Sequence, residues 1–263
     1  MGDKIINFKS YFDELAESIK NEAEENQIFF MPNPGNWGDG LINYSTFDFF
    51  EYYNIKFEIL APKKRKYYYR LKNLLNIKSN SILIYGGGGG WNAFWKFPLI
   101  KLQDHGVMNL FRKVIVLPST YETYINDEKM VYYSRDSYNS MVNNPSSTFC
   151  PDMAFFLYNR DFSKYSTNEH KKGFFYRTDR ESANRIIIPK DNHDLSLDGD
   201  YLDHYHNFFK EIGKYEVIHT DRLHICIAGF LLKKEVYFYQ GGYFKNEAIY
   251  KSILSSFENI HFE

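Results

Sequence analysis

The chain alternates between short, almost wholly apolar runs and longer segments in which apolar residues recur every three or four positions. The short runs predict β-strands at residues 27–33, 56–60, 81–90, 113–120, 131–137, 173–178, 185–189, 216–220 and 235–240. Of these, the strand in 81–90 runs into glycines, and the strand in 131–137 gives way to a helix. The longer segments predict helices at residues 8–25, 41–54, 200–215, 221–232 and 246–257. Strands that are apolar throughout are typical of sheets covered on both faces. The alternation of strand and helix therefore predicts an α/β fold with mostly parallel sheets.

A polar stretch at residues 158–173 separates two such α/β patterns. It predicts an N-terminal domain at residues 1–157 and a C-terminal domain at residues 158–263. In parallel sheets, ligands bind at the carboxyl ends of the strands, often in a crevice. Residues that directly follow a strand are therefore the first candidates for a functional site.

Composition narrows the class of protein. The 263 residues include 32 basic and 33 acidic side chains, and a net charge of −1 does not favour a nucleic-acid partner. Cys150 and Cys226 lie in apolar runs without a metal-binding pattern, and no metal site is expected. No segment resembles a signal peptide or a membrane span, so we expect a cytoplasmic protein. We attribute the aromatic content of 19% to the core rather than to sugar binding.

The segment PGNWGDG, residues 34–40, follows a predicted strand and precedes a predicted helix. It lacks the Lys-Ser/Thr pair of a phosphate-binding P-loop, and the carboxylate of Asp39 would repel a phosphate. Asn36 and Gly38 are candidate substrate-binding residues. Two roles stay open for Asp39, which either caps the helix or accepts a hydrogen bond from a sugar hydroxyl.

The run GGGGG, residues 86–90, follows another predicted strand. It is not a dinucleotide-binding fingerprint, because the third glycine of that motif would fall on Trp91. Gly87 and Gly88 are candidate substrate-binding residues, since glycine at a strand end allows close approach of either a ligand or a facing loop.

The segment HTDRLH, residues 219–224, places two basic side chains at the start of an apolar helix. With Thr220 or Asp221 as N-cap, Arg222 and His224 fall in the first turn, where each opposes the helix dipole by roughly 0.3–1 kcal/mol. A bound anion would compensate for this cost. The alternative is that Arg222 pairs with a nearby aspartate and that His224 is a satisfied histidine of the core. Arg135 and Lys245 follow strands elsewhere and are expected to join the same site.

On these segments the sequence resembles the polysaccharide pyruvyl transferase family. The matching pieces are GNWGDGLI, the strand-borne GGGG, LPST, SRDS, PDMAF, YRTD and HTDRLH, in order along most of the chain. The resemblance implies two Rossmann-like domains that face each other across a cleft, as in GT-B glycosyltransferases, with the acceptor on the N-terminal side and the donor on the C-terminal side. The chain departs from the family in being short and in reading LPST where an LPQ-type segment is usual.

The resemblance also implies a reaction. Phosphoenolpyruvate would be the co-substrate, without a further cofactor, and a pyruvate ketal would form on a sugar hydroxyl pair of a surface or capsular glycan. Arg222, Arg135 and Lys245 would bind the donor, His224 would transfer a proton, and Asp39 would act on the acceptor. The acceptor would be a sugar or a lipid-linked oligosaccharide, which allows peripheral membrane association. Two alternatives stay open: a GT-B glycosyltransferase that uses a nucleotide sugar, and a non-catalytic glycan-binding assembly subunit.

Overall fold

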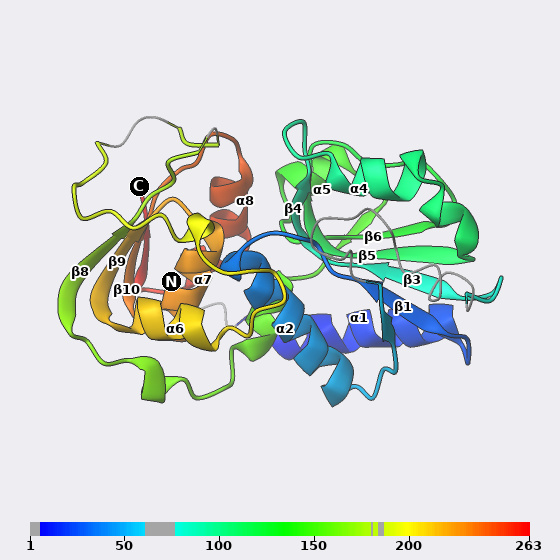
Figure 1. Ribbon diagram of the computed structural model, residues 1–263, viewed down its shortest axis with the longest axis horizontal. Helices are drawn as coiled ribbons and strands as arrows, with labels where there is room; N and C mark the ends of the chain where they lie inside the picture. The colour runs from blue at the N-terminus through cyan, green and yellow to red at the C-terminus, as the bar shows by residue number, and fades with distance from the viewer. Residues whose placement is uncertain (1–5, 61–76, 180, 184–186) are drawn as a thin grey trace.

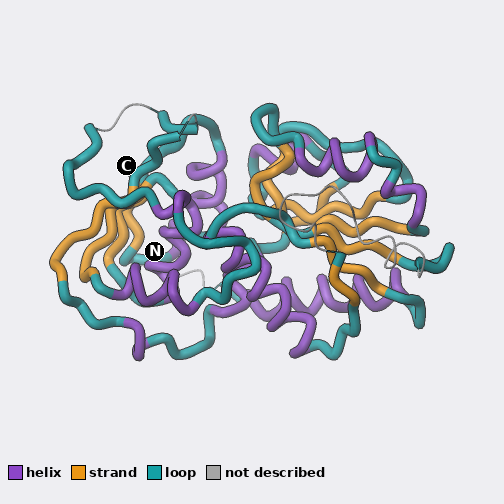
Figure 2. Tube along the Cα trace, viewed as in Figure 1, coloured by secondary structure: helices purple, strands orange, loops and turns teal. Residues whose placement is uncertain are grey.

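The computed structural model describes residues 6–60, 77–179, 181–183 and 187–263. Within these ranges it has an α/β fold with two sheets and seven α-helices, and the strands of every described pairing run parallel. The two sheets lie side by side along the long axis of the molecule (Figures 1 and 2). None of the helices in the described ranges combines the length and hydropathy needed to cross a bilayer.

The first sheet has the strand order β2-β1-β3-β5-β6-β7. In addition, β4 pairs with the C-terminal part of β5, after the part that pairs with β3. Its strands are β1 (Ile28–Met31), β2 (Glu58–Ile59), β3 (Ile82–Tyr85), β4 (Gly88–Trp91), β5 (Lys113–Tyr121), β6 (Met130–Ser134) and β7 (Ser147–Phe149). In Figure 1, α1 (Phe8–Ala23) and α2 (Trp37–Tyr52) lie below this sheet, and α4 (Phe97–Leu99) and α5 (Asn139–Asn143) lie above it.

Coverage on both faces explains the unbroken apolar runs of this sheet. Alternate side chains of a strand point to opposite faces. Accordingly, Phe30 and Ile84 belong to one buried cluster, whereas Phe29 and Leu83 belong to a second cluster on the other face. Each residue of β1 and β3 is therefore buried, as the sequence predicted.

The second sheet has the order β11-β10-β9-β8. Its elements are β8 (His170–Phe175), α6 (His206–Gly213), β9 (Tyr215–Thr220), α7 (Leu223–Leu231), β10 (Glu235–Phe238), α8 (Lys245–Ser252) and β11 (Ile260–Phe262). The prediction of full coverage is wrong here, because burial alternates along β9 and β10. Ile218 and Val236 face the core, while His219 and Tyr237 stack on the other face with their ring centroids 4.8 Å apart and remain partly exposed.

One hydrophobic core joins the two halves of the chain. It contains Phe30 and Ile115 from the first sheet together with Ile218 and Val236 from the second. Between the sheets it includes the 3-10 helix η3 (Met153–Leu157), whose Phe155 ring lies 5.7 Å from that of Phe230 in α7. The predicted boundary after residue 157 falls directly beside this shared core, and the division into two domains stays a prediction.

Several predicted bounds are wrong. Helix α2 begins at Trp37 rather than at residue 41, and α6 covers only residues 206–213 of the predicted 200–215. The Asp200 carboxylate accepts a hydrogen bond from the Leu202 N–H at 3.1 Å, so a local turn competes with the helix there. Residues 185 and 186 of the predicted strand 185–189 lie outside the described residues, and residues 187–189 are not part of a strand.

Candidate active site

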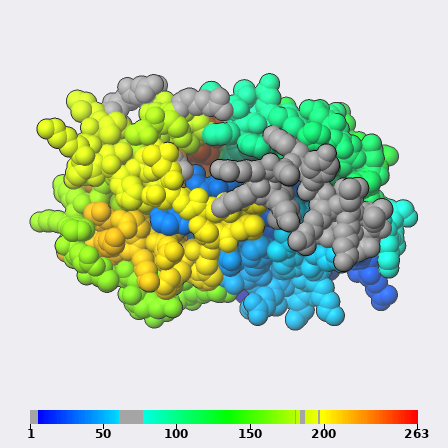
Figure 3. All heavy atoms as spheres, in the orientation of Figure 1, coloured from blue at the N-terminus to red at the C-terminus, as the bar shows by residue number. Residues whose placement is uncertain are grey.

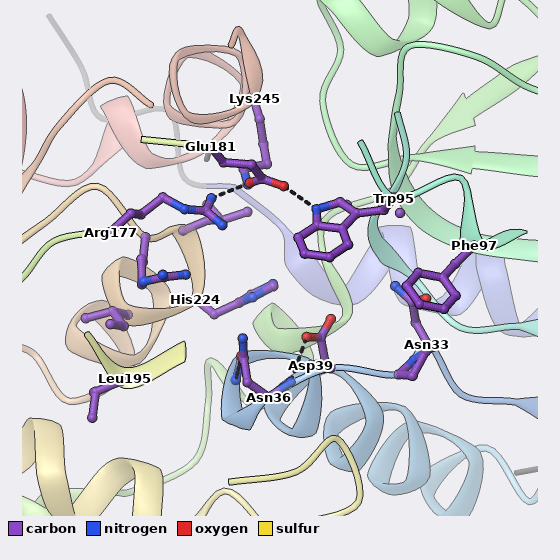
Figure 4. Close-up of a pocket in the computed structure, with 18 of the residues that line it drawn as sticks. Asn33, Asn36, Asp39, Trp95, Phe97, Arg177, Glu181, Leu195, His224 and Lys245 are labelled. Carbon is purple, nitrogen blue, oxygen red and sulfur yellow. Dashed lines mark hydrogen bonds and ion pairs between the residues drawn. The ribbon is translucent and has the colours of Figure 1, made fainter. Parts of the chain in front are cut away.

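A pocket of about 270 Å³ is lined by residues from both halves of the chain. It opens where the N-termini of α2, α7 and α8 approach the first sheet, and Figure 3 shows the surface hollowed between the yellow and the cyan-to-green segments. Every predicted functional side chain lines it, together with one predicted glycine: Asn36, Gly38, Asp39, Arg135, Arg222, His224 and Lys245. Figure 4 shows most of these side chains directed into the same space.

The other two predicted glycines, Gly87 and Gly88, are not part of the lining, which instead includes Gly89 and Gly90. A Cβ on Gly87 would lie only 2.6 Å from the carbonyl oxygen of Pro118, and Gly88 has a φ of +127° that favours glycine. Of the two explanations offered by the sequence, close approach of a neighbouring chain segment accounts for these positions. The glycine run enters β4 rather than forming a loop.

The start of α2 fixes one wall of the pocket. Asn36 is the N-cap, and its side-chain oxygen accepts a hydrogen bond from the Gly38 N–H at 2.9 Å. Asp39 is not the cap itself; it completes a capping box by accepting a hydrogen bond from the Asn36 N–H at 3.1 Å. Burial raises the pKa of Asp39 above its ordinary value, although His224, the Asn36 N–H and Arg135 oppose this shift. Asp39 thus both completes the capping box and lines the pocket.

The start of α7 forms the facing wall. The helix begins at Leu223 with Arg222 as N-cap, so neither Thr220 nor Asp221 is the cap. The Thr220 hydroxyl instead accepts a hydrogen bond from the Arg222 N–H at 3.0 Å, and Asp221 accepts one from the Arg177 N–H at 2.8 Å. No side-chain cap is formed for the first N–H groups of α7 among the described residues, and these groups lie at the pocket.

The Arg222 guanidinium is paired with carboxylates of the protein. Its Nη2 lies 2.6 Å from Asp194 Oδ1 and 3.2 Å from Asp179 Oδ2. The alternative that Arg222 pairs with nearby aspartates is therefore confirmed, although the side chain also lines the pocket. Burial opposes ionisation of Asp194, but Arg222 and the Thr178 N–H and hydroxyl outweigh it and hold the pKa of Asp194 well below its usual range.

His224 is not a satisfied histidine of the core. Its side chain is 18% exposed, and its Nε2 lies 3.6 Å from Asp152 Oδ2, beyond hydrogen-bond distance. Among the described residues, this nitrogen has no hydrogen-bond partner. The ring packs against Gly38 so closely that a Cβ there would lie 2.8 Å from Nδ1. The imidazole is thus held between Asp152 and the start of α2.

Arg135 is fully buried behind β4, the strand that contains Gly88, Gly89 and Gly90. Its Nε donates to the Thr120 hydroxyl at 2.8 Å, and its Nη1 pairs with Asp152 Oδ2 at 2.7 Å. Its Nη2 faces Gly89, where an added Cβ would lie 3.3 Å away. Burial raises the pKa of Asp152, but His224 and Arg135 outweigh burial and hold this pKa well below its usual range. One buried carboxylate therefore positions both the guanidinium and the imidazole.

Lys245 is the first residue of α8, and its Nζ lies 3.6 Å from Glu181 Oε2. Burial and the neighbouring Arg177 lower the pKa of Lys245 to about 7, although Glu181 acts in the opposite direction. Arg177 also forms an ion pair with Glu181, whose other oxygen accepts a hydrogen bond from the Trp95 indole N–H. These contacts connect the second half of the chain with the segment after β4 (Figure 4).

Sequence reasoning missed six residues of the site, among them Asp152 of the PDMAF segment, which pairs with Arg135 and lies near His224. Arg177 and Asp179 belong to the YRTD segment, which was available as a signal, whereas Asp194 lies in a polar loop segment that the sequence analysis did not assign to the site. Glu181 and Trp95 carry no local pattern that marks them. Within the described ranges, His, Cys, Asp and Glu side chains form no group of three or more arranged to hold a metal ion.

The charges of the site are arranged in two layers. Basic side chains dominate the lining, which includes Arg135, Arg177, Arg222, His224 and Lys245 but only two acidic residues, Asp39 and Glu181. Most of the carboxylates that pair with these cations stand outside the lining, namely Asp152, Asp179 and Asp194. The guanidinium groups are thus held from behind, while their front faces a small concave space suited to a compact anion.

Comparisons with known proteins identify a family and a similar solved structure. A family model described as polysaccharide pyruvyl transferase matches residues 36–240. The crystal structure of a functionally uncharacterized protein from Klebsiella pneumoniae subsp. pneumoniae NTUH-K2044 is similar, with a TM-score of 0.75 and 28% sequence identity, and the alignment covers 98% of this chain and 99% of that one. No curated protein matches the sequence. The family match spans most of the chain and includes every predicted functional side chain of the pocket except Lys245. The chain belongs to the polysaccharide pyruvyl transferase family.

Proposed function

We propose that the protein transfers the pyruvyl group of phosphoenolpyruvate to two hydroxyl groups of a surface or capsular glycan, which gives a pyruvate ketal and inorganic phosphate. The observation that carries this proposal is the basic lining of the pocket at an N-terminus of α7 that has no side-chain cap among the described residues. A helix N-terminus and convergent basic groups favour phosphate and carboxylate ligands. Phosphoenolpyruvate carries both groups in one small molecule.

The donor would lie against Arg135, Arg222 and Lys245. The two guanidinium groups already have fixed orientations through Asp152 and Asp194, so binding requires little reordering. Lys245 differs, because its lowered pKa leaves it partly neutral near pH 7 until an anion favours the ammonium form.

Ketal formation requires a defined sequence of proton transfers. The methylene carbon of the donor gains a proton, which makes C2 electrophilic, and the first hydroxyl oxygen forms a bond to C2 as it loses its proton. The second hydroxyl oxygen then forms a bond to C2, the C2–O bond to phosphate breaks, and the second hydroxyl proton leaves with the phosphate. One of the two hydroxyl protons thus balances the proton gained by the methylene carbon.

We assign proton transfer to the methylene carbon to His224, and support comes from its position in the pocket lining beside the basic residues, with Nε2 3.6 Å from Asp152 Oδ2. Asp39 belongs to the start of α2, against which the His224 ring packs, and is assigned to the acceptor. Its raised pKa makes the carboxylate a better base than an ordinary aspartate. Asn36 and Gly38 would shape the acceptor side of the same wall.

We further propose a GT-B-like arrangement, with residues 1–157 on the acceptor side and residues 158–263 on the donor side. Support comes from the pocket lining, to which both halves contribute. A lipid-linked acceptor would bring a cytoplasmic enzyme to the membrane surface without a spanning helix. Phosphoenolpyruvate would serve as co-substrate, with no separate cofactor.

The test is phosphate release from phosphoenolpyruvate in the presence of simple glycosides. His224→Asn should lower kcat by roughly 10²–10⁴-fold while the melting temperature stays near that of the wild type. His170→Asn, at an exposed position of β8, is the matched control and should be fully active. Stabilisation of the protein by nucleotide sugars but not by phosphoenolpyruvate would overturn the proposal in favour of a glycosyltransferase.

A further inference from the structure

We propose that Trp95 and Phe97 form the acceptor subsite, a platform on which a sugar ring of the glycan stacks. This inference rests on the proposed function and adds the place where the acceptor binds. Both residues belong to the segment that follows β4, and both line the pocket. Figure 4 shows them across the pocket from Arg177 and His224, which belong to the side assigned to the donor.

The exposure of these rings distinguishes them from the aromatic residues of the core. Trp91, four residues before Trp95, is 1% exposed and packs between Tyr121 and Tyr132. Trp95 and Phe97 remain 39% and 36% exposed, respectively. These two rings therefore line the pocket and keep an exposed surface there, unlike the buried rings of the core.

The chemistry next to the rings fits a sugar. A pyranose has a face of C–H groups and a rim of hydroxyl groups, so it needs an apolar surface beside hydrogen-bonding groups. Trp95 and Phe97 supply the apolar surface, while Asn33, Asp39 and Glu181 line the same pocket. A small anionic donor gains nothing from an apolar ring, whereas a neutral sugar does.

Neighbouring groups hold both rings in place. The Trp95 indole N–H donates to Glu181, which is paired with Arg177 and lies 3.6 Å from Lys245. The Phe97 ring has the Nζ of Lys101 5.6 Å from its centroid. Rigid aromatic groups bind with little loss of conformational entropy. The contact through Glu181 also connects the platform with the cations on the donor side.

Phe94 provides a matched control, because it belongs to the same segment and is 44% exposed but is not part of the pocket lining. Trp95→Ala and Phe97→Ala should each raise the KM for a methyl pyranoside acceptor by about tenfold, with the KM for phosphoenolpyruvate unchanged. Phe94→Ala should leave both constants unchanged. Trp95→Tyr, which keeps a ring, should recover most of the affinity for the acceptor.

The proposed function and the platform fail in different ways. If the wild type transfers pyruvate but both alanine variants keep the acceptor KM, or if Phe94→Ala raises it equally, the platform is refuted while the proposed function stands. If the wild type does not act on phosphoenolpyruvate, saturation-transfer NMR with the same methyl pyranosides shows whether the two rings still bind a sugar. Sugar binding that is lost in both pocket variants and kept in Phe94→Ala supports the platform, and any other pattern overturns it.

Discussion

Binding of phosphoenolpyruvate should be accompanied by proton uptake at Lys245. Burial and Arg177 lower the pKa of Lys245 to about 7 against the opposing effect of Glu181, so at pH 8 about nine-tenths of the side chain is neutral. An anion placed against Nζ favours the ammonium form. If the pKa returns to its ordinary range in the complex, binding takes up about 0.9 proton at pH 8 and about 0.1 at pH 6.

The assay is isothermal titration calorimetry of phosphoenolpyruvate in buffers of different ionisation enthalpy, at both pH values. Protons exchanged by the ligand itself are common to all variants, so the informative quantity is the difference between the wild type and Lys245→Met. His224→Asn should keep the uptake. Equal proton uptake by the wild type and Lys245→Met at pH 8 would refute the reasoning. A second readout is affinity, which should fall by up to about tenfold per pH unit above pH 7 in the wild type only.

Three further predictions concern stability and geometry. Folding lowers the pKa of Lys245 from 10.5 to about 7, so the charge of this side chain opposes folding most below pH 7 and less as the pH rises. Lys245→Met should therefore raise the melting temperature more at pH 6 than at pH 9. An equal rise at both pH values would contradict this. Asp152→Asn leaves the buried Arg135 without its carboxylate and should lower the free energy of unfolding, measured in urea at pH 7, by about 3–5 kcal/mol. Because folding lowers the pKa of Asp152, the difference between the variant and the wild type should shrink below about pH 4. Gly38→Ala would place a methyl carbon 2.8 Å from His224 Nδ1, and it should reduce kcat without a matching loss in melting temperature. An unchanged kcat would argue against a role for the His224 ring in the reaction.

The parts of the site that the sequence predicted are those set by local pattern. Arg222 and His224 follow a strand and begin a helix, and both positions depend on neighbouring residues in the chain. Arg135 directly follows β6, and Lys245 begins α8. Since the carboxyl ends of parallel strands meet along one edge of a sheet, each sheet brings its candidate residues to one edge without any knowledge of their individual contacts.

Local pattern also explains the error at α2. The capping box formed by Asn36 and Asp39 is visible in the sequence, but Gly38 and Gly40 are poor helix formers, so the predicted start moved to Leu41. In the structure, these glycines are required by tertiary contacts. A Cβ on Gly40 would lie 2.9 Å from the Asp203 carbonyl oxygen, and one on Gly38 would press on His224.

The contacts that the sequence did not predict join segments that are far apart along the chain. Trp95 and Glu181 are 86 positions apart, and Arg222 and Asp179 are 43 apart. No periodicity relates such positions, because their proximity depends on how the two sheets pack through the shared core. The same limitation applies to Trp95, which the sequence did not distinguish from the buried Trp91.

The pairing of the basic residues bears on how the pocket would select its ligand. An unpaired cluster of positive charge would attract many anions over a long range. Here carboxylates balance the guanidinium groups, so long-range attraction is weak and selection depends on the fixed directions of N–H groups. Glu181 already pairs with Arg177 and lies near Lys245, so an entering anion must compete with it. A compact ligand with two anionic groups would offset that competition through a second contact at the N-terminus of α7, which a single carboxylate or a neutral sugar would lack.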